Sequence, residues 1–214
     1  MEQEVHVPAA GVTLAGNLAV PPSARGVVLF AHGSGSSRHS RRNRYVARVL
    51  QEAGLATLLI DLLTPAEERI DDVTRNLRFD IRMLADRLIG ATEWLAGEDS
   101  TRDLRVGYFG ASTGAGAALV AASRIPERTS AVVSRGGRPD LAGAALPLVK
   151  APTLLIVGGN DHGVIELNEQ AYRQLRCERQ LEIVPGATHL FEEPGALEKV
   201  AELARDWFLR YLPS

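Results

Sequence analysis

GYFGASTGAG, residues 107–116, places four glycines around one serine near the middle of a 214-residue chain. The apolar run LRVGYF precedes Ser112 and an alanine-rich run follows it, so the serine stands where a strand gives way to a helix. A serine on so sharp a turn projects its hydroxyl above the sheet, and its strained backbone requires small neighbours. Gly110 and Gly114 leave that space free, and Gly116 is expected to let the helix approach the strand closely. The G-x-S-x-G pattern makes Ser112 a candidate nucleophile.

Short, continuous apolar runs lie on both sides of this turn and predict strands that are buried on both faces. Helical patterns alternate with them, which favours an α/β fold with a mostly parallel sheet, right-handed crossovers and helices on both faces. Strands are expected in 26–33, 56–63, 104–110, 130–137, 152–159 and 180–186, and helices in 41–53, 72–96, 112–124, 163–175 and 195–212. Before them, QEVHVP and VTLAGNLAVP flank Gly11 and predict an N-terminal antiparallel hairpin. No repeat or linker divides the sequence, so residues 1–214 are expected to form one domain.

The composition is that of a soluble globular enzyme or binding domain, with 45% hydrophobic and 23% charged residues. A net charge of −2 gives no global field that would attract nucleic acid or an acidic membrane surface, so neither partner is expected. The single cysteine, Cys177, excludes an internal disulfide and a cysteine-based zinc cluster. The N-terminal stretch MEQEVHVPAA lacks the features of a signal peptide, and a cytoplasmic location is expected. The pattern leaves the oligomeric state open.

Two polar residues follow late strands, at the end of the sheet where ligands bind in folds of this kind. Asp161 follows PTLLIVGG and His189 follows QLEIVPG. A serine nucleophile needs a base that takes its proton and a third group that fixes the tautomer of that base. Ser112, Asp161 and His189 occur in the Ser, acid, His order of the α/β-hydrolase fold. Alternatively, Asp161 only caps the following helix; Asp61, after ATLLI, is the substitute acid and is expected to make a structural hydrogen bond.

With these residues in place, the chain resembles the α/β-hydrolase superfamily over nearly its full length. The closest resemblance is to its dienelactone hydrolase-like branch of small members without a lid domain. HGSGSSR (32–38), GASTG (110–114), GGND (158–161) and GATHLFEEP (186–194) carry it. The resemblance implies a central sheet of about eight strands and a Ser-His-Asp triad that needs no cofactor and no metal. Enzymes that open dienelactones have cysteine at the nucleophile position, whereas this chain has Ser112.

The resemblance also implies an oxyanion hole built from two backbone N–H groups. One belongs to Thr113, directly after the nucleophile, and the other to Ser34, in the loop after the third strand. Gly33 and Gly35 are expected to keep this loop thin enough to reach the substrate. His32 is predicted to be a buried, hydrogen-bonding residue that shapes the loop. The sequence is thus predicted to be a serine esterase that acts on a small-molecule ester through an acyl-enzyme, with thioesters and lactones left open.

Basic residues gather on loops at the same end of the sheet. They are Arg38, Arg41, Arg42 and Arg44 after the oxyanion loop, and Arg135 and Arg138 after SAVVS. Such runs usually form a solvated face, but an arginine beside the site could bind a carboxylate or phosphate of the substrate. Arg135 is the first candidate for that role. His162, next to Asp161, and Gly35 are further candidates for contact with the substrate.

Two other functions stay open. GASTGAG also contains the glycine pattern of short-chain dehydrogenases, which bind NAD(P), but it does not follow the first strand and no tyrosine has lysine four residues later. This makes the dehydrogenase a remote alternative. A hydrolase fold with a catalytically silent triad would instead be a binding protein, which fluorophosphonate labelling distinguishes from an active serine enzyme.

Overall fold

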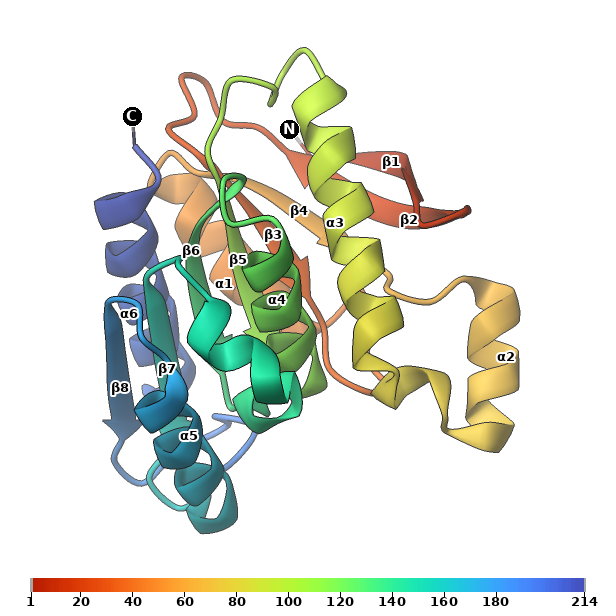
Figure 1. Ribbon diagram of the computed structural model, residues 1–214. Helices are drawn as coiled ribbons and strands as arrows, with labels where there is room; N and C mark the ends of the chain where they lie inside the picture. The colour runs from red at the N-terminus through yellow and green to blue at the C-terminus, as the bar shows by residue number, and fades with distance from the viewer. Residues whose placement is uncertain (1, 214) are drawn as a thin grey trace.

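The computed structural model describes residues 2–213, and an eight-stranded sheet runs through them (Figure 1). The strands are β1 (Glu2–Ala9), β2 (Val12–Ala19), β3 (Val27–Ala31), β4 (Ala56–Ile60), β5 (Val106–Ala111), β6 (Thr129–Arg135), β7 (Thr153–Gly158) and β8 (Arg179–Val184). Their order in the sheet is β1-β2-β4-β3-β5-β6-β7-β8. The pairs β1–β2 and β2–β4 are antiparallel and all other pairs are parallel. The predicted sheet of about eight strands with an N-terminal hairpin is confirmed.

The N-terminal hairpin turns at Ala10 and Gly11, whose φ angles are 49° and 80°. Two consecutive positive φ angles are typical of the two-residue turns whose twist matches that of the flanking strands. In the hairpin, Ala9 lies opposite Val12 next to the turn. Because β2 also pairs with β4, the hairpin extends the parallel sheet at one edge.

Helices cover both faces of the sheet, as predicted (Figure 1). The helices are α1 (Arg41–Glu52), α2 (Pro65–Thr74), α3 (Ile81–Gly97), α4 (Thr113–Arg124), α5 (His162–Gln174) and α6 (Ala196–Tyr211), with the 3₁₀ segments η1 (Leu77–Phe79) and η2 (Pro139–Leu148). Helices α1 and α6 pack on one face, and α3, α4, α5 and η2 on the other. Along β3, Leu29 belongs to the core under α3 and α4, and Val28 and Phe30 belong to the core under α1 and α6. This burial on both faces explains the continuous apolar runs of the sequence.

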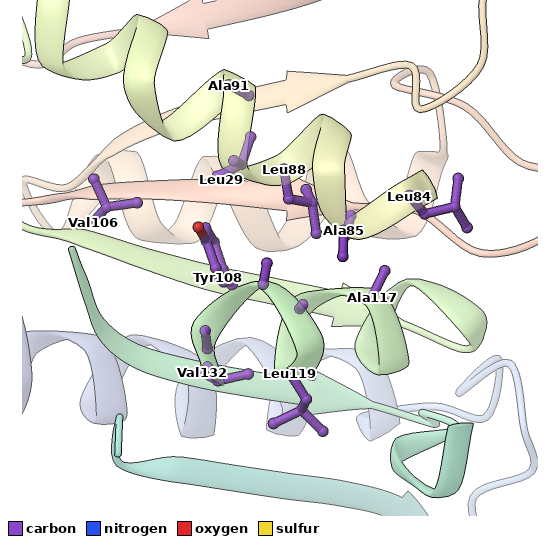
Figure 2. Close-up of a cluster of buried hydrophobic side chains, with 14 of the residues drawn as sticks. Leu29, Leu84, Ala85, Leu88, Ala91, Val106, Tyr108, Ala117, Leu119 and Val132 are labelled. Atoms are coloured by element: carbon purple, nitrogen blue, oxygen red, sulfur yellow. The ribbon is translucent and has the colours of Figure 1, made fainter. Parts of the chain in front are cut away.

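Figure 2 shows the core layer between the sheet and helices α3 and α4. Leu84 and Leu88 of α3 and Ala117 of α4 face the strands, and each is fully buried or nearly so. Tyr108 of β5 lies in the same layer, and its hydroxyl forms a 2.6 Å hydrogen bond with Thr92 Oγ1. A buried tyrosine needs such a partner for its polar end. This layer fixes α4, and with it the turn at Ser112, against the sheet.

The single long helix predicted for 72–96 is wrong. Helix α2 ends at Thr74. The next residue, Arg75, has a left-handed φ angle of 55°, and α3 begins only after Asp80. The Asp80 carboxylate accepts a hydrogen bond from the Met83 N–H and caps the new helix. Val73, which lies within the predicted range, is 85% exposed. The apolar spacing thus continued by chance across a break that capping residues decide.

The connection between β6 and β7 is short and holds only η2, so no lid domain enters at this point of residues 2–213. Figure 1 shows α2 standing apart from the helices that cover the sheet. Over the described part of the chain, none of the helices has both the length and the apolar character needed to span a bilayer.

Candidate active site

Ser112 lies between the end of β5 and the start of α4, in the strained conformation that the sequence predicts. Its φ and ψ angles are 51° and −123°, and a positive φ on a residue with a side chain costs on the order of 1 to 3 kcal/mol. Its carbonyl oxygen accepts hydrogen bonds from the N–H groups of Ala115, at 3.1 Å, and Arg138, at 2.9 Å. These bonds hold the turn in place and leave the serine side chain partly exposed.

Two glycines make this turn sterically feasible. A Cβ atom on Gly114 would lie 2.6 Å from the carbonyl oxygen of His32, and one on Gly110 would lie 2.7 Å from the backbone nitrogen of Ala115. Real Cβ atoms do not approach backbone atoms so closely, and backbone cannot move aside as a flexible side chain can. Helix α4 therefore starts directly against β3 and β5 only because both positions are glycine.

The prediction that Gly116 lets the helix approach the strand is wrong. A Cβ atom there would lie 3.0 Å from the carbonyl oxygen of Arg138 and 3.0 Å from Leu141 Cβ, so Gly116 faces η2. The close approach of helix and strand occurs at Gly107 instead, where a Cβ atom would lie 2.7 Å from the ring of Phe208 in α6. All four glycines of residues 107–116 thus allow close packing, but each faces a different neighbouring segment.

His189 and Asp161 contact each other directly, with 2.6 Å between Nδ1 and Oδ2. Asp161 precedes α5, yet its side chain makes no capping hydrogen bond to that helix, and the contact with His189 takes its place. Because the carboxylate accepts the Nδ1 proton, Nε2 is the unprotonated nitrogen of the neutral imidazole. The imidazole is 41% exposed and can therefore meet a substrate.

Ser112 and His189 flank the same turn, at the end of β6. The Ser112 N–H donates to the carbonyl oxygen of Arg135 at 3.4 Å, and a Cβ atom on Gly136 would lie 3.5 Å from His189 Nδ1. Within residues 2–213, no hydrogen bond joins the Ser112 hydroxyl to His189. Such bonds are often long in hydrolases without substrate and tighten in the reacting complex. The structure thus joins His189 to Asp161 by a direct bond and to Ser112 through a shared turn.

The two segments that carry the candidate oxyanion donors are tied together. Ser34 Oγ and Thr113 Oγ1 form a 3.0 Å hydrogen bond. A Cβ atom on Gly33 would lie 3.0 Å from Ser112 Cβ, so a side chain at that position would crowd the serine. Thr113 is the first residue of α4, and N–H groups at a helix N-terminus favour negative charge. The backbone of both segments is therefore close to the candidate nucleophile.

His32 has the structural role that the sequence predicts. Its Nδ1–H donates to the Gly33 carbonyl oxygen at 2.9 Å, and its Nε2 accepts from the Leu62 N–H at 3.0 Å. Burial lowers the pKa of His32, which keeps the ring neutral at neutral pH. The neutral imidazole thus links the oxyanion loop to the segment that follows β4.

Asp61 is confirmed as a structural residue. Its carboxylate accepts hydrogen bonds from the Arg38 backbone N–H at 2.7 Å and from Arg38 Nη1 at 2.6 Å. Arg138 is paired in a similar way, since Asp140 accepts from both Nε and Nη2. Two of the arginines at this end of the sheet therefore have carboxylate partners already.

A cavity of about 460 Å³ opens beside the oxyanion loop. It is lined by His32, Gly33, Ser34, Gly35, Ser36, Ser37, His39, Ser40, Leu62, Leu63, Glu68, Asp71, Asp72, Arg78, Leu84 and Thr113. Gly35, a candidate for substrate contact, lies in this lining with a φ angle of 68°. His162, the other candidate, is exposed at the start of α5 and is not part of the lining. Leu62, Leu63 and Leu84 are the large apolar residues of the lining.

The acidic wall of this cavity was missed by the sequence prediction. It comes from α2, where burial and the nearby charges of Asp61 and Asp72 raise the pKa of Glu68. The signal that could have located α2 is TPAE, residues 64–67. It forms a capping box between Thr64 and Glu67, which marks the start of this helix.

The eight-stranded sheet, with a serine on the strained turn between β5 and α4, has the α/β-hydrolase fold. Within this class the chain belongs to the dienelactone hydrolase family, whose family model matches residues 14–212. The resemblance predicted from the sequence motifs is therefore confirmed, and the chain is a member of a family of hydrolases.

Three known proteins illustrate the similarity. A dienelactone hydrolase crystal structure from Anabaena variabilis ATCC 29413 has a TM-score of 0.97 and 66% identity, over 99% of this chain and 98% of that chain. Est1E from Butyrivibrio proteoclasticus has a TM-score of 0.80 but 17% identity, over 97% and 98%, and shares the fold alone. A Mycobacterium tuberculosis (strain ATCC 25618 / H37Rv) protein named "Putative phosphoribosyl transferase" is 63% identical over 211 residues, 99% of this chain and 47% of that protein. The chain thus spans about half the length of that relative.

Proposed function

We propose that the chain is a serine hydrolase that cleaves carboxylic esters of small molecules through an acyl-enzyme on Ser112. The family supplies the class of reaction. The finer proposal rests on one observation, the 2.6 Å contact of His189 with Asp161 next to the turn that holds the strained serine. A partly buried carboxylate, an accessible imidazole and a serine at one end of the sheet are the groups that acyl transfer requires.

In the first half of the proposed reaction, Ser112 Oγ attacks the ester carbonyl carbon while His189 Nε2 takes its proton. Asp161 holds the imidazole in the required tautomer and stabilises the imidazolium that forms. The N–H groups of Thr113 and Ser34 hold the oxyanion, and each such donor is worth about 10² to 10³ in rate. The imidazolium then gives its proton to the leaving oxygen, and the alcohol departs.

In the second half, water replaces the alcohol. His189 takes a proton from the water as it attacks the acyl carbon, and the same two N–H groups hold the second oxyanion. Collapse of this intermediate breaks the bond to Ser112 Oγ, which takes the proton back from the imidazolium. The carboxylic acid is released and the free serine is restored. This chemistry uses only the residues named, and the same route is open to thioesters and lactones.

The cavity beside the oxyanion loop supports a substrate of modest size. A volume of about 460 Å³ holds a small organic group, and the apolar lining residues Leu62, Leu63 and Leu84 suit a hydrocarbon chain. The connection between β6 and β7 adds no lid domain within residues 2–213, so we expect one end of the substrate to extend into solvent. We assign the acyl group to this cavity because it adjoins both proposed oxyanion donors.

The relative that is named a phosphoribosyl transferase is about twice as long as this chain, which covers 47% of it. The hydrolase family model matches residues 14–212, nearly the whole of the shared part. We therefore infer that the shared part performs hydrolase chemistry, and we do not extend the transferase name to it.

The proposal is tested by Ser112→Ala with p-nitrophenyl acetate as substrate. Turnover should fall by about 10⁴-fold or more, since loss of the nucleophile removes the acyl-enzyme route. Ser123→Ala is the control, because Ser123 lies near the far end of α4 and its hydroxyl donates only to the Val120 carbonyl oxygen. A fluorophosphonate should label the wild type at Ser112 and leave Ser112→Ala unlabelled. A folded wild type that is neither labelled nor active would instead support the silent binding protein.

A further inference from the structure

Arg135, the last residue of β6, is a buried cation without a partner. It is 8% exposed, and among residues 2–213 nothing accepts a hydrogen bond from its Nε or Nη1. Buried guanidinium groups are almost always paired, because an uncompensated buried charge is costly. Arg38 and Arg138, at the same end of the sheet, follow that rule through Asp61 and Asp140. Arg135 is therefore the exception that requires an explanation.

The position of Arg135 links it to the proposed active site. Val133, two residues earlier in the strand, belongs to the core under α1 and α6, so Arg135 lies on that face of the sheet. Its carbonyl oxygen accepts from the Ser112 N–H, and the next residue, Gly136, is in contact with the loop of His189 and Phe191. Phe191 belongs to the same core. The side chain thus lies on the side from which the His189 loop reaches the site.

A second arginine approaches from α1. Arg42 Nε is also buried without a hydrogen-bond partner in the described part of the chain. Burial, and then the charge of Arg42, lower the pKa of Arg135 to about 10, so the Arg135 guanidinium stays charged at neutral pH. Glu192 Oε1 lies 3.6 Å from Arg42 Nη1 on a side chain that is 67% exposed, and it offsets only one of the two charges.

We propose that Arg135 and Arg42 form an anion subsite, which binds a carboxylate or phosphate group carried by the ester substrate. Unpaired guanidinium donors make short, charge-assisted hydrogen bonds to both kinds of group. The subsite lies outside the cavity beside the oxyanion loop, since neither arginine is part of its lining. The inference rests on the proposed ester hydrolysis and narrows it to esters with one anionic end.

The first experiment compares kcat/KM for three p-nitrophenyl esters of similar size. One carries a free carboxylate, as in mono-p-nitrophenyl succinate, one carries a phosphate, and one, the butyrate, is uncharged. The wild type should prefer an anionic ester by about 10- to 100-fold, the range expected of hydrogen bonds to a charged group. In Arg135→Gln this ratio should fall by at least about 10-fold. The ratio does not depend on how much of the variant is folded.

Two further variants complete this comparison. Arg135→Lys keeps the charge and should retain part of the preference. Arg124→Gln is the matched control, since Arg124 is exposed and pairs with Asp86 on helix α3, and it should leave the ratio unchanged. Should Arg135→Gln fail to fold, Arg42→Gln carries the same test, because Arg42 is a partly exposed residue of α1.

The second experiment detects the anion without turnover. In Ser112→Ala, inorganic phosphate or succinate should raise Tm at constant ionic strength, with sodium chloride as the reference, and this rise should be lost when Arg135→Gln is added. The anion with the larger effect shows which group the subsite prefers. If Tm rises in this way but wild type has neither activity nor fluorophosphonate labelling, the ester hydrolysis fails and the anion subsite stands. If esters are hydrolysed but neither the ratio nor Tm responds to Arg135→Gln, the subsite is overturned and the hydrolase stands.

Discussion

Two regions border the same cavity, one through Thr113 and the other through the segment 64–80, and they are held by different forces. The turn at Ser112 is fixed by backbone sterics, since Gly110 and Gly114 lie where no Cβ atom fits. The segment 64–80, which holds α2 and η1, is held by charges. Arg87 Nη2 lies 2.7 Å from Glu67 Oε1 in a pair that spans 20 residues of sequence.

The second region is also much less buried than the first. The α4 residues that follow Ser112 are buried, whereas the large apolar side chains Ile70, Val73 and Phe79 are more than half exposed. Packing fixes a conformation through neighbours on every side, and an ion pair fixes only the distance between two groups. The comparison teaches that the turn at Ser112 should be intolerant of any added atom, and that the α2 segment should respond mainly to changes of charge.

The largest effect is expected from Gly114→Ala. The new methyl group would collide with the carbonyl oxygens at the end of β3, and we expect a loss of about 3 kcal/mol or more in the free energy of unfolding. Gly97→Ala is the matched control, because a Cβ atom there meets nothing within 4 Å. Alanine in this helix should stabilise by up to about 1 kcal/mol. Urea unfolding measures both, and a Gly114→Ala protein as stable as wild type would refute the steric account of the turn.

A smaller effect is expected from Glu67→Gln. The change removes the charge that faces Arg87, whose side chain is only 5% exposed, and should cost about 1 to 2 kcal/mol. Asp99→Asn is the control, since its pair with Arg102 is exposed and should contribute less than about 0.5 kcal/mol. Equal losses in the two variants would show that the α2 segment is not held by its ion pairs.

The same pair should make part of the stability depend on pH. The hydrogen bond from Arg87 holds the pKa of Glu67 below its ordinary value. A lowered pKa in the folded state means that the contribution is complete above the ordinary carboxyl pKa and is lost as the pH falls through the folded pKa. The difference in unfolding free energy between wild type and Glu67→Gln should therefore be constant near neutral pH and shrink below about pH 4. A difference that stays constant to lower pH would contradict the linkage.

The smallest effect is expected from Val73→Ser in α2. With 85% of Val73 exposed, the change should alter the free energy of unfolding by less than about 0.5 kcal/mol. Ala117→Ser in α4 is the buried counterpart, and a hydroxyl without a partner there should cost about 1 to 3 kcal/mol. Thermal unfolding of the two variants measures the contrast. A large loss in the free energy of unfolding for Val73→Ser would mean that the Val73 face of α2 is covered by other residues or another molecule in solution.

Most of the fold could be predicted because the strands are buried on both faces and therefore read as uninterrupted apolar runs. Ser112 was recognisable because its environment is local, with the strand, the glycines and the helix all within ten residues. The contact between His189 and Asp161 joins two loops, yet their places at strand ends were enough to suggest it. The catalytic roles of these three residues stay predictions until they are tested by mutation.

The errors concern features that the apolar pattern does not show, namely local helix caps and neighbours distant in sequence. The helix predicted for 72–96 failed because Arg75 and Asp80 break it, although the apolar spacing continues. Gly116 was assigned to the strand because the sequence does not show that η2 packs against α4. The pairing of the arginines was equally hidden, since Arg38 finds Asp61 only after the fold has formed.

The hydrogen bonds of His32 should make the conformation of the oxyanion loop depend on pH. Both ring nitrogens are engaged, so a second proton would displace the Leu62 N–H and release the loop from the segment after β4. Because burial holds the pKa of His32 below its ordinary value, this contribution to stability is complete above the pKa of a free histidine and is lost as the pH falls through the folded value. Acid would thus release the loop that contains Ser34, although the Ser112 hydroxyl itself would not change. Protonation of the buried His32, and not of Ser112, would then set the lowest pH at which the site keeps its shape.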